Sequence, residues 1–452
     1  MNILYINHYA GSPQHGMEYR PYYLAREWVR AGHAVRMLAA SYSHVRAQQP
    51  DLAAMHTAAS HAPNGQSGQS SHPLPGDVVQ EAVEEAGAKS GRATVQHIDG
   101  VAYHWYATPA YVGNGVGRVK NIWSFLRQVW LDAPRLARTF EPDVVIASST
   151  YPMDIWVAHR IAKLARKQGK PCKLVFEVHD LWPLSPIELG GMSPRHPFIM
   201  LCQAAEKYAY QHADVVVSML PKVAEHMQSH GLDVRKLHIV PNGITLDEWE
   251  GDATPLRADV ASHLAAQKAA GRKVVGYAGS HGTPNALEVL LQAAAHMQTE
   301  PFSFVLVGSG HEKAALQQQA QEWGLQHVAF FDPIPKAHIP AFLAQLDIAY
   351  IGWQRVPIYR FGIAPNKLMD YMMARCVVLH SVEAGNDPVA EAGCGMTVPP
   401  ADPQAVADGL RQLARLDAAT RQRMGESGRQ FVLDNHTYPV LAQRFLNACR
   451  AD

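Results

Sequence analysis

The chain has 452 residues, of which 47% are hydrophobic and 18% charged, with 40 basic and 40 acidic side chains. This composition excludes a largely disordered or fibrous protein, the length favours two or three domains, and the charge balance argues against nonspecific binding to nucleic acid. The five cysteines are scattered without CxxC spacing, which argues against a zinc knuckle or a disulfide framework and favours buried, reduced thiols.

The amino terminus lacks the basic and apolar regions of a signal peptide, and no apolar run approaches about 20 residues. We therefore expect a cytoplasmic chain without a membrane span. The first half of the chain then repeats an order of strand, loop, helix and strand, which predicts a parallel sheet with helices on its faces. Its strands are expected at 3–6, 35–39, 144–147, 174–178, 214–218 and 237–240, and its helices at 19–31, 154–168 and 222–230.

A second series of the same kind begins after a charged, weakly patterned stretch over 247–272. Its strands are expected at 274–278, 303–307, 328–331, 347–351 and 377–380, and its helices at 286–297, 312–323 and 367–374. Two such series predict two doubly wound α/β domains of the Rossmann-like type, 1–245 and 246–437, with ligands bound in the cleft between them. We expect 438–452 to form a last helix that packs back on the first domain.

Residues 44–97 interrupt the first series. This stretch is rich in Ala, Gly, Ser, Gln and His, and such a composition buries little apolar surface. We predict a mobile insertion with some helix near 78–88 and assign it no catalytic role.

Glycine-rich turns follow two strands of the second series. Gly276 to Gly282 contains three glycines before a helix, and Val307 to Gly310 has two. Glycines let the backbone approach a phosphate, and the N-terminus of the next helix offers free N–H donors. A tight strand-to-helix turn without any ligand explains the same residues equally well.

The segment from Gly362 to Tyr371 places Pro365 directly before an expected helix, with Lys367 and Asp370 in its first turns. Such a helix start is an anion site to which Lys367 adds charge, while Asp370 can bind the vicinal hydroxyls of a ribose. The alternative is an ordinary helix start with an i, i+3 pair between Lys367 and Asp370.

Several such segments occur in a fixed order along nearly the whole chain outside 44–97. They are Gly16-Met17-Glu18, Glu177-Val178-His179-Asp180-Leu181-Trp182-Pro183, Val240-Pro241-Asn242-Gly243-Ile244, Tyr277-Ala278-Gly279, Pro365-Asn366-Lys367-Leu368-Met369-Asp370-Tyr371-Met372 and Ala401-Asp402-Pro403. On these segments the chain resembles the family 4 retaining glycosyltransferases of the GT-B fold. It is most similar to the branch that builds bacterial surface polysaccharides and includes acetylfucosamine transferases.

The resemblance implies that the donor is a nucleotide-diphosphate sugar, and we expect the nucleotide to be UDP. In the family, the Gly16 loop faces the donor diphosphate from the first domain, Asp370 binds the ribose, and Lys367 with Arg360 neutralises the phosphates as the bond to the sugar breaks. The residues implied in nucleotide and phosphate binding are Gly16, Gly279, Ser280, His281, Gly282, Arg360, Lys367, Leu368 and Asp370.

The chain departs from the family pattern at two positions. Gly362 stands where the family has a first acidic residue that contacts the donor sugar, so sugar recognition is expected to use the backbone around Gly362, Ile363 and Ala364. The Gly279 turn is not followed by the family's usual basic residue, and His281 lies near that position instead. Neutralisation of the phosphates is therefore expected to depend more on Lys367.

His179 follows a buried strand, so its ring is expected at the carboxyl edge of the sheet. Most of the 24 histidines are expected to be structural. The resemblance implies that His179 and Lys367 are the catalytic residues. It also implies that His179 forms a hydrogen bond with a hydroxyl of the donor sugar. Glu18 and Asp180 are candidates for acceptor binding, with helix capping and loop bracing as the alternatives.

The run from Gly117 to Trp130 mixes basic and large apolar residues at roughly helical spacing. It is typical of an amphipathic helix packed on the first domain, and also of a helix that lies on a membrane surface. The second interpretation implies peripheral contact with the inner face of the plasma membrane, beside a lipid-linked acceptor.

We interpret the chain as a retaining glycosyltransferase of cell-surface polysaccharide synthesis that acts on a glycan or lipid-linked acceptor. No metal or other cofactor is expected, because Lys367 and helix N-termini take the place of a cation. Two alternatives remain at this point: a nucleotide-sugar 2-epimerase, which needs additional acid and base carboxylates, and a nucleotide-sugar-binding protein without turnover, which Gly362 slightly favours.

Overall fold

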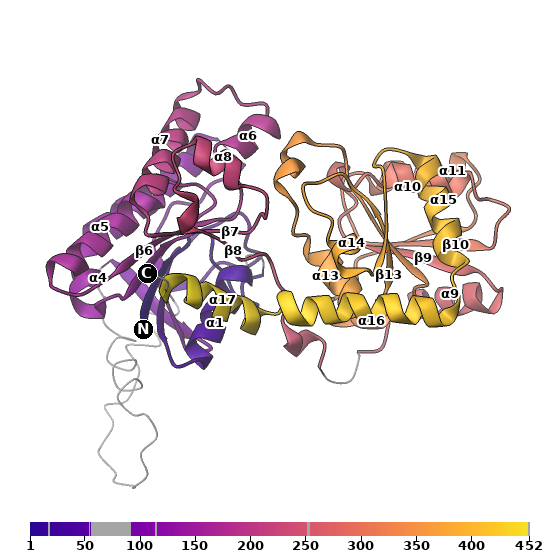
Figure 1. Cartoon of the computed structure of the whole chain (residues 1–452), viewed down its shortest axis with the longest axis horizontal. Helices are drawn as coiled ribbons and strands as arrows, with labels where there is room; N and C mark the ends of the chain where they lie inside the picture. The colour runs from indigo at the N-terminus through magenta and orange to yellow at the C-terminus, as the bar shows by residue number, and fades with distance from the viewer. Residues whose placement is uncertain (17–18, 54, 56–91, 114, 251–253, 451–452) are drawn as a thin grey trace, which may run out of the picture. The chain divides into compact units, whose positions relative to one another are not determined.

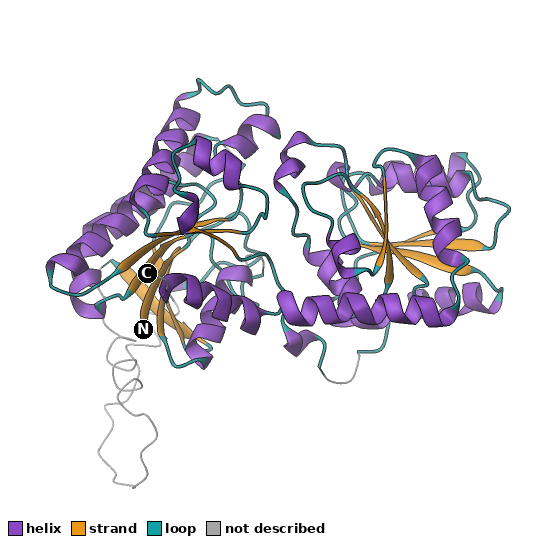
Figure 2. Ribbon diagram, in the orientation of Figure 1, coloured by secondary structure: helices purple, strands orange, loops and turns teal. Residues whose placement is uncertain are grey.

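The computed structural model describes residues 1–16, 19–53, 55, 92–113, 115–250 and 254–450. It divides into two compact units, each built around a sheet with helices packed on it (Figures 1 and 2). The first unit comprises Met1–Met219, Ala224–Val240 and Ala442–Asp452, and the second comprises Leu220–Val223 and Pro241–Leu441. The predicted class of two parallel-sheet α/β domains is confirmed.

The sheet of the first unit has the strand order β3-β4-β2-β1-β5-β6-β7-β8. Its strands are β1 (Asn2–Ile6), β2 (Ala34–Ala40), β3 (Ala93–Ile98), β4 (Val101–Tyr106), β5 (Val144–Ala147), β6 (Lys173–Val178), β7 (Val215–Ser218) and β8 (Leu237–Ile239). All neighbours are parallel except β3 and β4. The central strands are apolar runs because parallel strands are covered on both faces.

Helices cover both faces of this sheet (Figure 2). They are α1 (Tyr19–Arg30), α4 (Val116–Phe140), α5 (Asp154–Lys167), α6 (Leu184–Glu188), α7 (Pro197–His212) and α8 (Ala224–Ser229). α4 is amphipathic, and the side chains on its inner stripe, among them Ile122, Phe125 and Val129, are buried. The run from Gly117 to Trp130 is therefore a helix packed on the first unit, as one of the two interpretations predicts.

The predicted limits of the insertion are wrong at both ends. Arg46 is buried, its guanidinium lies 5.0 Å from the Trp105 ring centroid, and it donates to the carbonyl of Ala40 at 2.5 Å. At the other end, residues of 93–97 belong to β3, which pairs antiparallel with β4. The expected helix near 78–88 lies outside the described residues.

The sheet of the second unit is wholly parallel, with the order β11-β10-β9-β12-β13-β14. Its strands are β9 (Lys273–Ala278), β10 (Phe302–Val307), β11 (Val328–Phe331), β12 (Ile348–Gly352), β13 (Val377–Ser381) and β14 (Gly395–Val398). Alternate residues of β9 enter opposite cores: Val275 and Tyr277 on one face, Val274 and Ala278 on the other.

The helices of the second unit include one in the stretch 247–272, which the sequence pattern left unassigned. They are α9 (Ala258–Ala269), α10 (Leu287–Ala295), α11 (Lys313–Glu322), α12 (Ile339–Leu343), α13 (Asn366–Met373), α14 (Pro388–Ala392), α15 (Pro403–Ala414) and α16 (Ala418–Asn435). Asp402 and Asp417 cap the last two by accepting from the N–H of Ala405 at 2.9 Å and of Thr420 at 2.7 Å.

The last helix, α17 (Tyr438–Arg450), begins in the second unit and ends in the first. The Trp28 indole of α1 donates to the carbonyl of Ala442 at 3.1 Å, and its ring lies 5.1 Å from that of Phe445. The chain changes unit after Val240 and after Leu441, a few residues from the expected limits at 245 and 437. All five cysteines are buried free thiols, which confirms the prediction made for them.

We predict that Phe445→Ala destabilises the first unit by about 3–5 kcal/mol, because it empties a buried aromatic site against Trp28. Gln443→Ala, on an exposed position of the same helix, is the control. Urea unfolding followed by tryptophan fluorescence measures the difference. Equal midpoints for the two variants would show that α17 contributes little to the first unit.

Candidate functional site

Each sheet has one point where the strand order reverses. In the first unit the chain passes from β1 to β2 on one side, while β5 adds on the other side of β1; in the second unit β9 lies between β10 and β12 in the same way. Open α/β sheets bind ligands outside the carboxyl ends of the strands at such a point. Ligands are therefore expected at the loops after β1, β5 and β6 in the first unit, and after β9 and β12 in the second.

A buried carboxylate, Glu177, lies at the end of β6 in the first unit. Its Oε1 pairs with Arg20 of α1 at 2.9 Å, and its Oε2 accepts from the Tyr5 hydroxyl at 2.5 Å and from the Ser148 hydroxyl at 2.7 Å. Burial by itself raises the pKa of the Glu177 carboxyl, but the Arg20 guanidinium beside it holds that pKa well below its usual range. Glu177 is therefore a fixed negative charge.

His179 is attached to this buried network. Its Nε2 lies 2.8 Å from the Ser148 Oγ and 3.4 Å from the Glu177 Oε2, and its side chain is 12% exposed. Two side chains from neighbouring strands thus fix the orientation of the ring at the carboxyl edge of the sheet, where the sequence predicted it. Asp180, the next residue, is exposed.

Two further ionisable groups are buried at this edge, and the sequence did not single them out. His8, after β1, lies 2.7 Å from the Tyr151 hydroxyl, and burial together with Arg46 lowers its pKa to about 3. Asp154, at the start of α5, accepts from the N–H of Ser149 at 2.8 Å, and burial raises its pKa to about 7. His8 is therefore neutral at ordinary pH.

Gly16 has a left-handed φ of +68°, and a Cβ there would lie 2.9 Å from the Cβ of Ala47. Both observations require a glycine at this position whether or not a phosphate is bound. Glu18, a predicted acceptor residue, lies outside the described residues.

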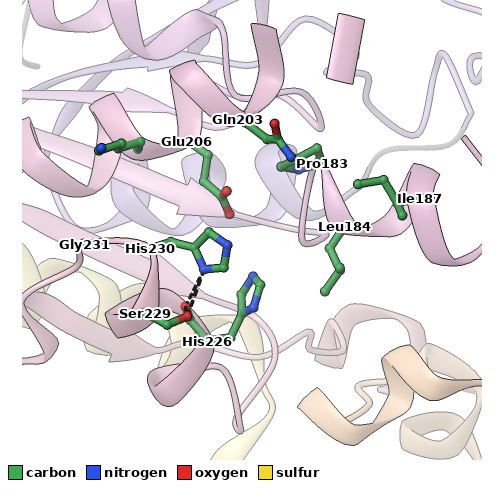
Figure 3. Close-up of a pocket in the computed structure, with 10 residues that line it drawn as sticks. Pro183, Leu184, Ile187, Gln203, Glu206, His226, Ser229, His230 and Gly231 are labelled. Atoms are coloured by element: carbon green, nitrogen blue, oxygen red, sulfur yellow. Dashed lines mark hydrogen bonds between the residues drawn. The ribbon is translucent and has the colours of Figure 1, made fainter. Parts of the chain in front are cut away.

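A hollow of about 470 Å³ lies in the first unit, beside the loop that follows His179 (Figure 3). Pro183, Leu184 and Ile187 form an apolar wall, and Glu206 of α7 points toward His230 on the opposite side. Glu206 accepts from the Tyr210 hydroxyl at 3.0 Å, and burial raises its pKa to about 7. The hollow combines an apolar wall with several hydrogen-bonding groups.

Lys367 is the central side chain of the site in the second unit. It extends from the first turn of α13 to the end of β9, where its Nζ donates to the Asn285 Oδ1 at 2.6 Å and to the Tyr277 hydroxyl at 2.8 Å. The hydroxyl of Tyr371, one turn further along α13, accepts from the N–H of Ala278 and ties this helix to β9. Burial lowers the pKa of the Lys367 amine to about 8.

Gly279 makes room for this amine. Its φ is +153°, and a Cβ at this position would lie 3.2 Å from the Lys367 Nζ. Gly308, after β10, has no space for a Cβ either, because the carbonyl oxygen of Gly279 would lie 1.8 Å away. The glycines after β9 and β10 thus allow two loops and one cation to pack together, which a simple turn would not require.

His281 is not a cation. Its ring is fully buried, and burial, with Lys313 and Lys367 nearby, lowers its pKa to about 4. Neither ring nitrogen has a hydrogen-bond partner among the residues that the structure describes. The neighbouring carbonyl of Ser280 accepts from Tyr277 and Asn285, and Gly282 is buried beside them.

Asp370 does not pair with Lys367, so the alternative of an ordinary i, i+3 ion pair is wrong. Within the described part of the chain its carboxylate accepts no hydrogen bond. Burial raises its pKa to about 7, with opposing effects from the nearby Lys336 and Glu248. Leu368, between them, is a core residue, so its side chain is not available to a ligand. Its backbone N–H already donates to the Pro365 carbonyl.

The segment before α13 requires a correction. The N–H of Gly362 donates to the Tyr359 carbonyl at 2.9 Å, and that of Ile363 donates to the Asn386 side chain at 2.7 Å. The backbone groups expected to recognise the sugar are therefore already paired.

The other two residues predicted near this segment also have internal contacts. The Ala364 carbonyl lies 3.5 Å from the Asn242 amide. Arg360 is exposed, lies over its neighbour Phe361 at 4.3 Å and donates to the Pro357 carbonyl at 2.7 Å. The guanidinium of Arg360 thus contacts residues of the same short helix.

Sequence reasoning missed Asn285, Asn386, Ser148 and the partners of Glu177. Glu177 carried a signal, since it is a charged residue inside the apolar run of β6, whereas Asn285, Asn386 and Ser148 are small polar residues in loops. Among the helices that the structure describes, none is both long and apolar enough to cross a bilayer. Nor do three or more His, Cys, Asp or Glu side chains of the described residues converge in a way that could hold a metal ion.

The chain matches two family models, a glycosyl transferase 4-like domain over residues 15–243 and a glycosyl transferases group 1 domain over residues 272–415. It is 23% identical to the probable glycosyltransferase WbjE of Pseudomonas aeruginosa, over 62% of this chain and 68% of that protein. It is 24% identical to WcaI of Escherichia coli strain K12, whose name assigns it to colanic acid biosynthesis, over 61% of this chain and 67% of that protein.

Solved structures share the fold. Sucrose-phosphate synthase from Thermosynechococcus elongatus has a TM-score of 0.63 at 16% identity, covering 99% of this chain and 98% of that one. Anabaena HepE in complex with UDP and glucose has a TM-score of 0.60 at 14% identity, covering 100% of both chains. The fold is GT-B, and the chain belongs to the glycosyl transferase 4-like family.

Proposed function

We propose that the protein is a retaining glycosyltransferase that transfers a sugar from a UDP-sugar to a glycan or lipid-linked acceptor in the synthesis of a cell-surface polysaccharide. The observation that carries this proposal is the Lys367 amine, held between Asn285 and Tyr277 at the end of β9. One turn later lies Asp370, whose carboxylate has no hydrogen-bond partner among the described residues. The names of WbjE and WcaI support the polysaccharide, and the UDP-bound structures of HepE support the nucleotide.

The donor diphosphate is assigned to Lys367 and the N-terminus of α13. A phosphate there would receive a hydrogen bond from a cation and would face the positive end of a helix. Among the described residues, the hydrogen-bond partners of the Lys367 amine are a phenol and an amide, and no acidic side chain forms an ion pair with it. The leaving diphosphate thus meets a preorganised positive charge.

The ribose is assigned to Asp370, because a carboxylate without internal partners can accept from two vicinal hydroxyls. His179 is assigned to a hydroxyl of the donor sugar. The acceptor hydroxyl attacks the anomeric carbon on the face from which the nucleotide diphosphate leaves, and its proton passes to the leaving phosphate, so the configuration is retained. No metal ion takes part in this proposal, since Lys367 supplies the charge; addition of EDTA is expected to leave the rate unchanged.

The acceptor is assigned to the first unit. The hollow beside Pro183 supports this, because an apolar wall suits the face of a sugar ring while Gln203 and Glu206 offer hydrogen bonds to its hydroxyls. Asp180 is exposed next to His179 and remains a candidate acceptor residue.

The direct test uses a panel of nucleotide sugars with the purified protein. Thermal shift identifies the donor, since a bound ligand raises the unfolding temperature. Release of the nucleotide together with formation of a glycosylated product establishes transfer. The α or β configuration of the new glycosidic bond establishes whether the configuration is retained. Formation of an epimer instead, binding without turnover, or no binding of any donor would each contradict the proposal.

We predict that Lys367→Ala and Asp370→Ala each weaken donor binding roughly 10- to 100-fold, the cost of losing a hydrogen bond to a charged group. Lys268→Ala and Asp434→Ala remove the same charges from exposed positions on α9 and α16 and serve as controls. Calorimetric titration with the donor measures the four dissociation constants. Wild-type affinity in both site variants would remove the site assignment.

Donor affinity should also depend on pH. Burial lowers the pKa of Lys367 to about 8, so the amine is charged below that pH and neutral above it. A bound diphosphate favours the charged form, and the dissociation constant therefore rises up to about tenfold per pH unit above about pH 8. The Lys367→Ala variant should lack this dependence; the same slope in both proteins would assign the titration to another group.

Glu177 is predicted to act through His179. Glu177→Gln should lower kcat roughly 100-fold, because it loosens a ring that must be placed accurately, while donor affinity changes little. Ser148→Ala is a milder version that leaves the Arg20 ion pair intact. Combined with His179→Ala, neither change should lower kcat much further; fully additive losses would show that Glu177 and Ser148 act independently of His179.

A further inference from the structure

The outer surface of two helices in the first unit is unusual in composition. α4 exposes a stripe of apolar and basic residues, and α5, which lies beside it (Figure 1), exposes basic residues on the adjoining face. We call this surface the α4–α5 face. It consists of Val116, Val119, Lys120, Trp123, Arg127, Trp130 and Leu131 of α4 with Arg160, Lys163 and Lys167 of α5.

The apolar members are large and solvent-exposed. Trp123 is 63% exposed and Trp130 is 40% exposed, and Val116 at the start of the helix is 72% exposed. Their spacing of seven residues places them on one side of α4, opposite the buried stripe. The inner stripe accounts for packing on the sheet, so packing does not explain the tryptophans.

The exposed charges on these helices are all positive. α4 carries five Lys or Arg residues and α5 carries four, whereas their two acidic residues, Asp132 and Asp154, are both buried. The whole chain has no net charge, so this is a local concentration of positive charge. Lys120, Lys163 and Lys167 form neither an ion pair nor a hydrogen bond with any residue that the structure describes.

Aromatic and basic groups also meet in a hollow of about 300 Å³ on this face, lined in part by Trp130, Arg160, Lys163 and Lys167. The Arg160 guanidinium lies 4.6 Å from the Trp130 ring centroid, and its Nε is buried without a hydrogen-bond partner among the described residues. The positions 160, 163 and 167 lie on one side of α5. Three cations therefore surround a space large enough for a phosphate group.

We propose that the α4–α5 face binds the surface of an anionic phospholipid bilayer, with headgroup phosphates at the hollow and the tryptophans in the interfacial region. Tryptophan favours the level of the headgroups, and unpaired lysines are attracted to anionic lipid. An acidic protein partner would match the charges but not the exposed tryptophan and valine stripe.

The face also extends to the site of the first unit. Arg118, in the first turn of α4, donates to the Tyr9 hydroxyl in the loop after β1 at 2.9 Å. A bilayer on this face would therefore lie next to the carboxyl edge of the sheet, where a lipid-linked acceptor could enter without leaving the membrane. This last step rests on the proposed function, whereas membrane binding itself does not.

The test is co-sedimentation of the full chain with vesicles of phosphatidylcholine alone, or of phosphatidylcholine mixed with phosphatidylglycerol. Binding is expected only to the anionic vesicles and should weaken at high salt. Lys120→Gln, Lys163→Gln and Lys167→Gln together should weaken it on the order of a hundredfold, at roughly fivefold per charge. The matched control removes three exposed charges from the second unit: Lys268→Gln, Arg415→Gln and Arg423→Gln.

The tryptophans are tested in the same way, with Trp123→Ala against Trp323→Ala, a tryptophan that is 37% exposed in the second unit. Circular dichroism confirms that each variant is folded. The proposal is overturned by no binding to anionic vesicles, by equal losses in the site and control variants, or by a dimer that Trp123→Ala converts to a monomer. Because no nucleotide sugar is needed, failure here is distinct from failure of the proposed glycosyl transfer.

Discussion

A parallel sheet must be covered on both faces, and this constraint determines where chemistry is possible in each unit. Side chains within the strands are committed to one of two cores, as the alternation of Val274, Val275, Tyr277 and Ala278 along β9 shows. Functional groups are therefore confined to the carboxyl ends of the strands and to the loops that follow. Both candidate sites lie there. In the second unit the strand order reverses at β9 itself, and in the first unit it reverses at β1, two strands from β6.

The two sites treat charge differently. In the first unit the Glu177 charge is buried, but Arg20 and two hydroxyls neutralise or solvate it, so the network is complete without a ligand. In the second unit Lys367 and Asp370 are partly buried and have no ion-pair partner among the described residues, and burial shifts the pKa of each in the direction that favours the neutral form. The first arrangement suits a rigid support for His179. The second arrangement leaves a cation and a carboxylate without charged partners. A ligand with phosphates and hydroxyls would supply partners to both.

The sequence predicted most of the strands that are buried on both faces, because they are short apolar runs between turn residues. It missed β4, although most of its side chains are buried, and the edge strands β3, whose central residues Gln96 and His97 are polar, and β14. It also missed α9, in which only Val260 and Leu264 are buried. Lys367 was recognisable from its place in the first turn of a helix, but its partner Asn285 is 82 residues away in a loop without a distinctive pattern. Pairing of the Ile363 N–H with Asn386 was likewise invisible, since it depends on how two loops meet.

The path of α17 has a consequence for synthesis of the protein. Trp28 of α1 packs against Phe445, so the core of the first unit is completed by residues that are synthesised after the second unit. Domains commonly fold in the order in which they are made. Here the second unit, which ends at Leu441, can close first. The first unit must wait with part of its apolar surface exposed, and a nascent chain that stalls before residue 442 presents that surface to chaperones and proteases.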